Sequence, residues 1–421
     1  MHKMKWCTKC TTPNTRPRIE FDAHGVCNAC TWGLDGKKNI DWKLKEQELQ
    51  DLIADRLREA GKRNYDVLIP VSGGKDSHYQ VWYAKNKLKL RVLAVNIEPL
   101  LPTKIGLQNR DNIAKAIGVD MLVMKNNPQV YAKLTREMFI EHGNPYIPFL
   151  YALFSGAARI AQEKNIPLFM YGENGETEYG GSTSELFSKL DNEGIHARII
   201  GNRPTCLRPE HWSEAYGIPK SDLLPYLDLD TSADVYRFFL ADFIPWNNNE
   251  HLHYALNVIG GFKLAKERTT GSYTHGYGTD DRLDELYLWF LWVKFGFHRS
   301  AKYAAKDIRE GKLTREKACE LVRLYDGEFP WESFDAVLNV LNMQEDEFWN
   351  VARRFVGDEE NLRREALEAG HNPEDITPAW EKIGENTWRH LAPIHGEQRI
   401  LQIPMPRMPV AEPETVIALA N

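Results

Sequence analysis

The chain has 421 residues, and 53 Lys and Arg against 59 Asp and Glu give a formal net charge of −6 at pH 7. This length suits two or three domains, and 43% hydrophobic residues provide material for a large core. The composition excludes disordered and fibrous proteins. The mildly acidic balance argues against a protein that binds nucleic acid over its whole surface.

The sequence shows neither a secretory signal nor a membrane span. No apolar run follows the lysines of the first five residues, as a signal peptide would require. The most apolar segment, 286–297, is shorter than the roughly 20 residues needed to cross a bilayer, and Lys294 interrupts it. We therefore expect a cytoplasmic protein without a membrane span.

Four of the six cysteines form two Cys-x-x-Cys pairs near the amino terminus. They are Cys7, Cys10, Cys27 and Cys30, with sixteen residues between the pairs. Two disulfides or a redox pair are the alternatives, but a reducing compartment disfavours a disulfide framework. Four thiolates complete a tetrahedral zinc site and leave no position for a substrate. We expect a structural Zn²⁺ module over 1–40, with the chemistry elsewhere.

Alternating strands and helices follow this module. Leu49, Leu52, Ile53 and Leu57 first recur at helical spacing, and Gly61 ends that pattern. Short apolar runs that alternate with segments of helical periodicity then predict strands at 67–71, 91–97, 121–124 and 167–171, and helices at 77–87, 107–117, 131–141 and 149–164. Repeated strand–helix units favour an α/β fold, with a parallel sheet covered by helices on both faces.

The second half of the chain has a different character. From Tyr254 the pattern predicts helices at 289–297, 301–311, 314–325 and 334–355. Beyond these lies a charged and Pro-rich tail. We predict four regions: a zinc module (1–40), an ATP-binding domain (41–250), a helical domain that completes the active site (251–356) and the tail (357–421).

A glycine loop joins the first predicted strand to the next helix. It reads Ser72-Gly73-Gly74-Lys75-Asp76-Ser77. The backbone N–H groups of such a loop and the helix N-terminus bind phosphate oxygens, and the lysine adds a full positive charge. Asp76 would repel a bare phosphate, so we expect it to hold Mg²⁺ at the nucleotide. A Walker A loop is excluded, because the first glycine of that motif would fall at Ile69.

The hexapeptide resembles the pyrophosphate loop (PP-loop) of the N-type ATP pyrophosphatases, the superfamily of asparagine synthetase and GMP synthetase. The resemblance implies an adenine nucleotide alpha hydrolase-like fold and cleavage of ATP between its α and β phosphates. The segment 171–181 resembles the acidic Gly-Glu loop of asparagine synthetase. That implies a nucleotide contact at Gly172, and Glu173 and Glu176 as Mg²⁺ ligands or as helpers in deprotonating ammonia. Asn96 would frame the adenine or merely cap a turn.

Lys294 stands among aromatic residues in the segment 294–299, which follows Thr279-Asp280-Asp281. A buried ammonium is costly, so this lysine reaches either water or an anion. Together with the cysteine pairs and the glycine loop, this segment resembles the N-acetyl sugar amidotransferases of surface-polysaccharide assembly. The resemblance covers roughly residues 4–330. It implies Lys294 and Arg299 as pyrophosphate contacts and an acetamido sugar, probably nucleotide-linked, as substrate.

The family implies a two-step reaction, in which ATP adenylates the acetamido carbonyl and ammonia then displaces AMP to give an acetamidino sugar of the lipopolysaccharide O-antigen type. The chain shows no glutaminase motif, since Cys206 lacks a glycine elbow. A separate glutaminase subunit and a barrel synthase-like partner that channels ammonia are therefore implied. Candidate contacts for the acidic part of the sugar form a loop cluster of Arg198, Arg203, Arg208 and Lys220; a merely solvated loop is the alternative.

Two other functions compete with this one. Some tRNA sulfur transferases also join a four-cysteine module to this loop, but they commonly carry further cysteines for sulfur chemistry, whereas Cys206 and Cys319 are isolated. The acidic net charge also offers little to tRNA, so we expect no nucleic-acid partner. A nucleotide sensor or scaffold without catalysis is possible on fold grounds, although the presence of Lys75, Asp76, Glu173 and Lys294 together argues against it.

Overall fold

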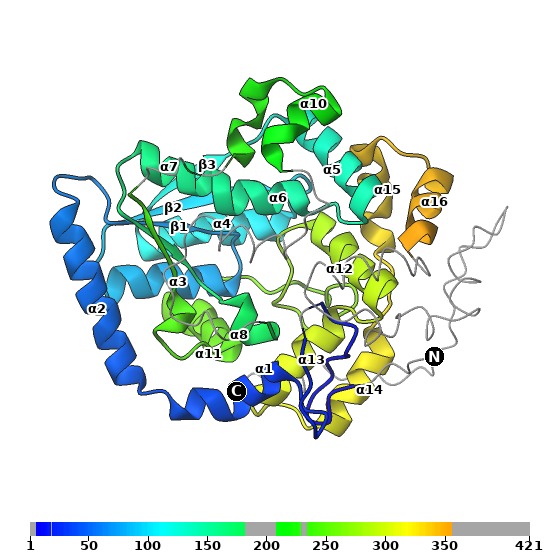
Figure 1. The fold of residues 1–421 in the computed structure, drawn as a ribbon, viewed down its shortest axis with the longest axis horizontal. Helices are drawn as coiled ribbons and strands as arrows, with labels where there is room; N and C mark the ends of the chain where they lie inside the picture. Colours follow the sequence, from blue (N-terminus) through cyan, green and yellow to red (C-terminus); the bar gives the residue numbers. More distant parts are fainter. Residues whose placement is uncertain (1–5, 18, 182–207, 228, 230–233, 356–421) are drawn as a thin grey trace.

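The structure is a computed structural model that describes residues 6–17, 19–181, 208–227, 229 and 234–355. Its centre is a five-stranded sheet in the order β3-β2-β1-β4-β5 (Figure 1). Every neighbouring pair of strands is parallel. The strands are β1 (Val67–Pro70), β2 (Val92–Ile97), β3 (Asp120–Met124), β4 (Leu168–Tyr171) and β5 (Tyr236–Phe239). The predicted α/β fold with a parallel sheet is confirmed.

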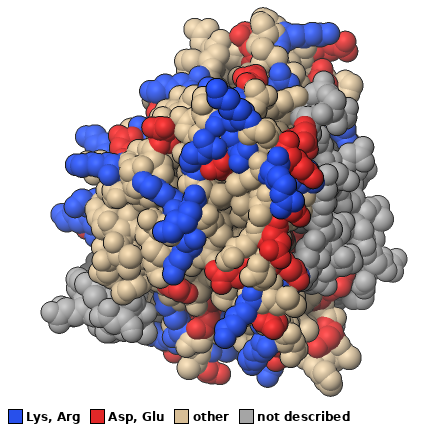
Figure 2. Space-filling view, turned by 90° about the vertical axis from the view of Figure 1, so that its left-hand side faces the viewer, with Lys and Arg blue, Asp and Glu red and all other residues tan. Residues whose placement is uncertain are grey.

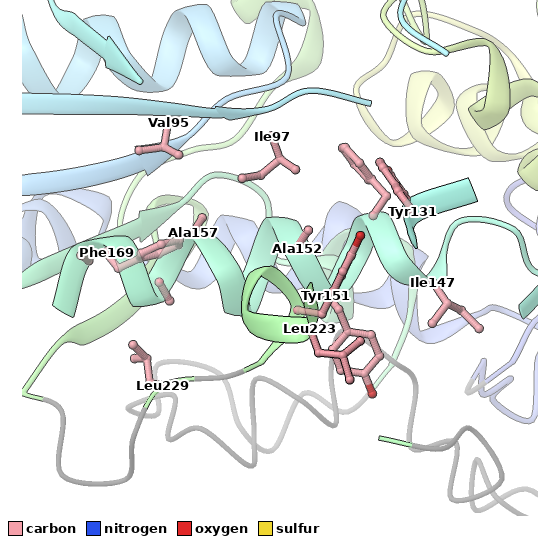
Figure 3. Close-up of a cluster of buried hydrophobic side chains, with 14 of the residues drawn as sticks. Val95, Ile97, Tyr131, Ile147, Tyr151, Ala152, Ala157, Phe169, Leu223 and Leu229 are labelled. Carbon is pink, nitrogen blue, oxygen red and sulfur yellow. The ribbon is translucent and has the colours of Figure 1, made fainter. Parts of the chain in front are cut away.

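Helices cover both faces of the sheet, because successive strand residues point to opposite sides. One face packs on α2 (Trp42–Glu59), α3 (Lys75–Asn86) and α4 (Lys104–Ile117). The other packs on α5 (Pro128–His142), α6 (Ile147–Tyr151), a π-helical turn (Ala152–Gly156) and α7 (Ala157–Glu163). Figure 3 shows this second core, in which Val95 and Phe169 of the sheet lie against Ala152 and Ala157.

The strand order reverses beside β1, which lies between β2 and β4. Ligands of open parallel sheets bind at such a switch point, in the crevice outside the carboxyl ends of the strands. Two of the predicted site loops follow the two strands at this point: Ser72–Ser77 follows β1 and Gly172–Glu176 follows β4. The topology thus places the glycine loop and the acidic loop at one edge of the sheet.

The carboxy-terminal part is helical, as predicted. Its helices are α11 (Asn248–His253), α12 (Arg282–Phe295), α13 (Arg299–Arg309), α14 (Arg315–Tyr325), α15 (Trp331–Leu341) and α16 (Glu345–Phe355). An aromatic core joins α12, α15 and α16 and includes Phe139 of α5. These helices are therefore packed against the α/β unit (Figure 1). The predicted limits of the four regions remain a prediction.

The short elements complete the description of the chain. They are α1 (Asn28–Cys30), α8 (Gly175–Tyr179), α10 (Trp212–Tyr216), π-helical turns at Thr31–Asp35 and Tyr254–Ile259, and 3-10 turns at Gly36–Asn39, Pro209–His211, Lys220–Tyr226 and Leu240–Asp242. On the side that α2 borders, Lys and Arg are interspersed with Asp and Glu (Figure 2).

Some predicted elements differ from the structure. The helix predicted over 334–355 is wrong, because Asn342 adopts a left-handed conformation (φ 49°) and separates α15 from α16. The helix predicted over 289–297 begins earlier, at Arg282, where the Asp281 side chain accepts the N–H of Leu283. The fifth strand was not predicted, since its four residues lie far from the strand–helix repeat and carry a charged Arg237.

Candidate active site

The four module cysteines converge on one point. The Sγ atoms of Cys7, Cys10, Cys27 and Cys30 all lie within 4.8 Å of one another, and all four residues are buried. Cys7 and Cys30 are 3.9 Å apart and Cys10 and Cys27 are 3.7 Å apart, far beyond a disulfide bond. Tetrahedral Zn²⁺ with bonds of about 2.3 Å requires sulfurs about 3.8 Å apart. The donor set therefore fits Zn²⁺, as the sequence predicts.

The module is docked on the helical region. Thr11 Oγ1 donates to the carbonyl oxygen of Ala301 on α13 at 2.9 Å, and Thr15 Oγ1 donates to that of Phe295 at the end of α12. Arg315 of α14 donates from Nη2 to the Cys7 carbonyl at 3.0 Å. The module thereby forms a wall beside α13.

The glycine loop has the conformation of an anion-binding turn. Gly73 has φ 110°, and a Cβ atom there would lie 2.9 Å from the backbone of α4, so only glycine fits. The Ser72 N–H donates to Ser77 Oγ at 3.1 Å, and the Gly74 N–H donates to Ser72 Oγ at 3.2 Å. Because α3 begins directly at Lys75, the N-terminus of this helix adds its positive end to the loop.

Asn96 supports this loop from β2. It is buried, and its Nδ2 donates to the Val71 carbonyl at 2.7 Å, immediately before the loop. Its Oδ1 is also buried and has no hydrogen-bond partner in the described part of the chain. An orphaned acceptor at this edge fits the donor of an adenine amino group.

Lys75 and Asp76 form a linked pair at the start of α3. Lys75 Nζ lies 2.6 Å from Asp76 Oδ2 and 4.3 Å from the centre of the Tyr277 ring. Burial opposes the ionisation of Asp76, but Lys75 and the hydrogen bond from His251 outweigh it and hold the pKa of this carboxyl far below its usual range. The side chain keeps 41% of its surface exposed. Asp76 is thus a charged ligand that is open to an incoming group.

His251 of α11 holds the other oxygen of Asp76. Its Nδ1 lies 2.7 Å from Asp76 Oδ1, and its ring stacks on Tyr79 with centroids 4.1 Å apart. Burial lowers the pKa of His251 in spite of Asp76, so the ring is neutral at pH 7. A neutral ring beside a carboxylate carries its proton on Nδ1 and donates it to Asp76. His251 therefore fixes the orientation of the Asp76 carboxylate.

Glu173 meets a lysine of α13. Its Oε1 accepts a hydrogen bond from Lys306 Nζ, which also lies 3.5 Å from Glu178 Oε2. Burial opposes the ionisation of Glu173, yet Lys306 outweighs it and lowers the pKa of this carboxyl, while Asp76 acts in the opposite direction. The two residues follow the neighbouring parallel strands β1 and β4, whose carboxyl ends lie at one edge of the sheet. The acidic loop and the glycine loop thus share one site.

The remaining predicted acidic residue points elsewhere. The Oε2 of Glu176 lies against Gly181, where an added Cβ atom would be 2.0 Å away. Among the described residues, only the four cysteines form a group of three or more potential metal ligands. The structure therefore brings Asp76 and Glu173 near each other but does not gather a three-carboxylate cluster with Glu176. Gly172 lies against Trp246, with an added Cβ 2.8 Å from that ring.

The two predicted cations of the helical region occupy different places. Arg299 is fully buried and donates from Nη2 to Asp284 Oδ2 at 2.6 Å. Arg299 is linked to the glycine loop through Asp280. Its positive charge favours the ionised form of Asp280, which accepts a hydrogen bond from Ser72. Lys294 Nζ instead donates to the His142 carbonyl and lies 4.8 Å from the centre of the Phe355 ring. The structure does not bring Lys294 into the group around Asp76 and Glu173.

Four site residues were not found from the sequence: Lys302, Lys306, His251 and Tyr277. A signal for the lysines exists, because the cations of α13 recur at spacings of three, four and three residues, which places them on one helix face. His251 and Tyr277 carry no local signal, since 175 residues separate His251 from Asp76. Of the predicted sugar contacts, Arg208 and Lys220 are exposed, and Arg198 and Arg203 lie outside the described residues, as does the isolated Cys206.

Comparison with solved structures gives only weak overall likeness. An NH3-dependent NAD synthetase from Campylobacter jejuni is 15% identical with a TM-score of 0.26, covering 44% of this chain and 91% of that one. The NMN synthetase from Francisella tularensis is 14% identical with a TM-score of 0.31, covering 68% and 92%. TM-scores this low support no inference about the fold beyond the strand order observed in this chain.

Comparison with known sequences is more informative. The uncharacterized protein MJ1599 of Methanocaldococcus jannaschii is 28% identical over 122 residues, which are 29% of this chain and 43% of that protein. The chain thus spans less than half the length of that relative. No helix in the described ranges has the length and apolar character needed to span a membrane. Residues 267–371, about a quarter of the chain, match the family model described as LPS biosynthesis protein WbpG-like, C-terminal domain.

Proposed function

We propose that the chain is an ATP-dependent, AMP-forming amidotransferase, which converts the acetamido group of an N-acetylated nucleotide sugar into an acetamidino group. One observation carries the proposal. Lys306, which lies within the WbpG-like region, meets Glu173 at the carboxyl end of β4, beside the glycine loop. A region typical of LPS biosynthesis therefore supplies charge to a crevice that has the features of a nucleotide site.

ATP would lie along the carboxyl edge of the sheet. The backbone N–H of Gly73 and the N-terminus of α3 would bind its pyrophosphate. Lys75 is 5% exposed and would neutralise part of that charge. Asn96 Oδ1 would accept a hydrogen bond from the adenine amino group.

The residues around Asp76 also fit Mg²⁺. Asp76 and Glu173 are ionised, are 41% and 28% exposed, and offer the carboxylate oxygens that this ion prefers. When bound, Mg²⁺ would supply positive charge against the pyrophosphate. His251 would keep one carboxylate oxygen of Asp76 turned in a fixed direction. We also propose that a structural Zn²⁺ ion binds the four cysteines, because their sulfur atoms lie at the spacing that this ion requires.

The chemistry would then proceed in two balanced steps. The acetamido carbonyl oxygen attacks the α-phosphorus of ATP, a P–O bond forms, and the bond to pyrophosphate breaks. Lys75 and Lys306 stabilise the negative charge that collects on the leaving group. Ammonia then adds to the activated carbon, AMP leaves with the former carbonyl oxygen, and the amidine remains after loss of a proton. Glu173, whose carboxyl is ionised at the same edge of the sheet, would accept that proton.

We further propose that ammonia comes from a separate glutaminase subunit, through a barrel synthase-like partner that channels it. The basis is the resemblance to N-acetyl sugar amidotransferases and the lack of a glutaminase motif in the sequence. In the assay, ammonium chloride replaces both partners.

The test incubates the purified chain with Mg-ATP, ammonium chloride and a panel of acetamido nucleotide sugars, and measures AMP together with product mass. We expect AMP, and one sugar in which oxygen is replaced by NH. Production of ADP, or AMP with bulk tRNA and a sulfur donor but with no sugar, would contradict the proposal.

A matched pair of variants ties the activity to the site. Asp76→Ala should retain the fold but abolish AMP formation. Asp111→Ala removes a carboxylate that is 66% exposed on the neighbouring helix α4 and should leave turnover unchanged. Equal turnover of the Asp76 variant and the wild type would remove the loop from the mechanism.

A further inference from the structure

The helix α13 carries four cations on one face: Arg299, Lys302, Lys306 and Arg309. Two of them have carboxylate partners, since Arg299 pairs with Asp284 and Lys306 pairs with Glu173. Among the described residues, Lys302 and Arg309 form no ion pair. Unpaired cations in a crowded protein environment are costly unless an anion meets them.

These two cations line a small cavity, partly open to solvent, between α13 and the four-cysteine module. The module contributes Arg16 to the same cavity, and Tyr179, at the end of α8, closes it. The hydrogen bonds of Thr11 and Thr15 to the helical region hold the two walls together. The cavity therefore collects three cations from two distant parts of the sequence.

Two of the guanidinium donors at this cavity are unsatisfied by any described residue, although Arg309 Nη2 donates to the Glu178 carbonyl at 2.6 Å. Arg16 Nε and Arg309 Nη1 are buried and have no hydrogen-bond partner in the part of the chain that the structure describes. Arg16 and Lys302 both lie over the Tyr179 ring, at 5.4 and 4.5 Å from its centre. A ring face provides only a weak substitute for a counter-ion. Lys306 also lies over this ring, at 5.4 Å from its centre, and three cations that share one ring leave most of their positive charge uncompensated.

Arg309 also lies near the cysteine sulfurs. Burial opposes its charge, but the cysteine sulfurs of the metal centre favour it and raise its pKa. Part of this charge therefore balances the thiolates. Burial lowers the pKa of Lys302 to about 8, although Glu173 opposes the change, and burial also lowers the pKa of Arg16. Arg16 and Lys302 carry the inference.

We propose that this cavity is an oxyanion-binding subsite, which holds the acidic part of the sugar substrate. The shared chemistry is a phosphate or carboxylate group, from either the diphosphate of a nucleotide sugar or an acid group on the sugar ring. Guanidinium and ammonium groups suit both. Lys302 precedes Lys306 by four residues, or about 6 Å along the helix, so the anion would lie one turn from the residue that meets Glu173. This inference rests on the proposed function.

The test is direct binding to the full chain by isothermal titration calorimetry, with Mg²⁺ and α,β-methylene ATP present to fill the glycine loop. The probes are UDP-N-acetylglucosamine, N-acetylneuraminate and neutral N-acetylglucosamine. Arg16→Gln and Lys302→Met each remove one cation from the cavity. Lys9→Met removes an exposed cation from the same module and serves as the matched control. Zinc content and thermal melting establish that each variant is folded.

We expect at least one acidic probe to bind more tightly than the neutral sugar. Tighter binding of UDP-N-acetylglucosamine would identify a phosphate as the bound group, and tighter binding of N-acetylneuraminate would identify a carboxylate. Each cavity variant should weaken that binding at least tenfold, because a charged hydrogen-bond donor is lost, while Lys9→Met stays within twofold. Binding by folded cavity variants that matches the wild type, equal binding of the neutral sugar, or no binding of either acidic probe would overturn the proposal.

The binding readout separates this inference from the proposed reaction. If no sugar is turned over but the acidic probe binds and both variants weaken it, the subsite stands and the amidation fails. If amidation occurs but neither variant raises the KM for the sugar, the subsite fails and the reaction stands.

Discussion

Replacing Lys306 by methionine tests the charge network that links α13 to the acidic loop. Lys306 is 2% exposed and contacts the carboxylates of both Glu173 and Glu178. Breaking a buried ion pair by removing one partner costs about 3–5 kcal/mol. Here Glu173 is 28% exposed and Glu178 keeps Lys37 at 2.5 Å, so both carboxylates retain some compensation. We expect Lys306→Met to lower the free energy of unfolding by about 2–3 kcal/mol at pH 7.

The pH dependence of this loss follows from the lowered pKa of Glu173. A carboxyl whose pKa is lower in the folded state than in the unfolded state adds stability above its unfolded pKa of 4.5, and this stability disappears as pH falls through the folded pKa. Lys306 is the main charge that lowers that pKa. The difference between wild type and variant should therefore be largest at pH 7 and should shrink near pH 4.

The assay is urea denaturation at pH 7 and pH 4, with Lys317→Met as the control. Lys317 pairs with Glu320 at 3.1 Å, but both side chains are about half exposed, so its loss should cost less than about 1 kcal/mol at either pH. Adding Glu173→Gln to Lys306→Met should restore part of the stability, because it removes the unpaired charge. A loss that is equal at both pH values, or no larger than that of the control, would refute this reasoning.

Three further predictions concern the rest of the site. His251→Phe keeps the stacked ring but removes the hydrogen bond to Asp76, and should raise the KM for Mg-ATP about tenfold in steady-state assays; an unchanged KM would exclude a positioning function. Wild-type protein should contain one zinc per chain by elemental analysis, and Cys10→Ser should lose it and melt at lower temperature; retained zinc would contradict the four-thiolate site. Gly106→Ala should destabilise by about 1–3 kcal/mol in thermal melts, because the new Cβ would lie 2.5 Å from the backbone of the helical region; Gly175→Ala, where nothing lies within 4 Å, should change little.

The features that the sequence could predict are local ones. The glycine loop, the cysteine pairs and the first four strands each occupy a short continuous segment whose spacing carries the signal. The parallel topology then follows from the strand–helix alternation. Within the site, this local reasoning found Asp76 and Glu173, which the structure places near each other.

The features that the sequence could not predict depend on contacts between distant segments. His251 meets Asp76 across 175 residues, and Lys306 meets Glu173 across 133. The aromatic neighbours of Lys294 made it a candidate for binding an anion. In the structure, helix α12 instead places its Nζ against the carbonyl oxygen of His142. Only the folded arrangement of α13 against the sheet edge selects Lys306 as the lysine beside Glu173.

In the proposed reaction, the carbonyl oxygen of the acetamido group attacks the α-phosphorus of ATP. The most direct measurement uses an acetamido nucleotide sugar labelled with ¹⁸O in that carbonyl, together with Mg-ATP and ammonium chloride, and follows the label by mass spectrometry. If the carbonyl oxygen attacks ATP, we expect one ¹⁸O atom in the AMP and none in the amidine product. Unlabelled AMP, or ADP in place of AMP, would contradict it.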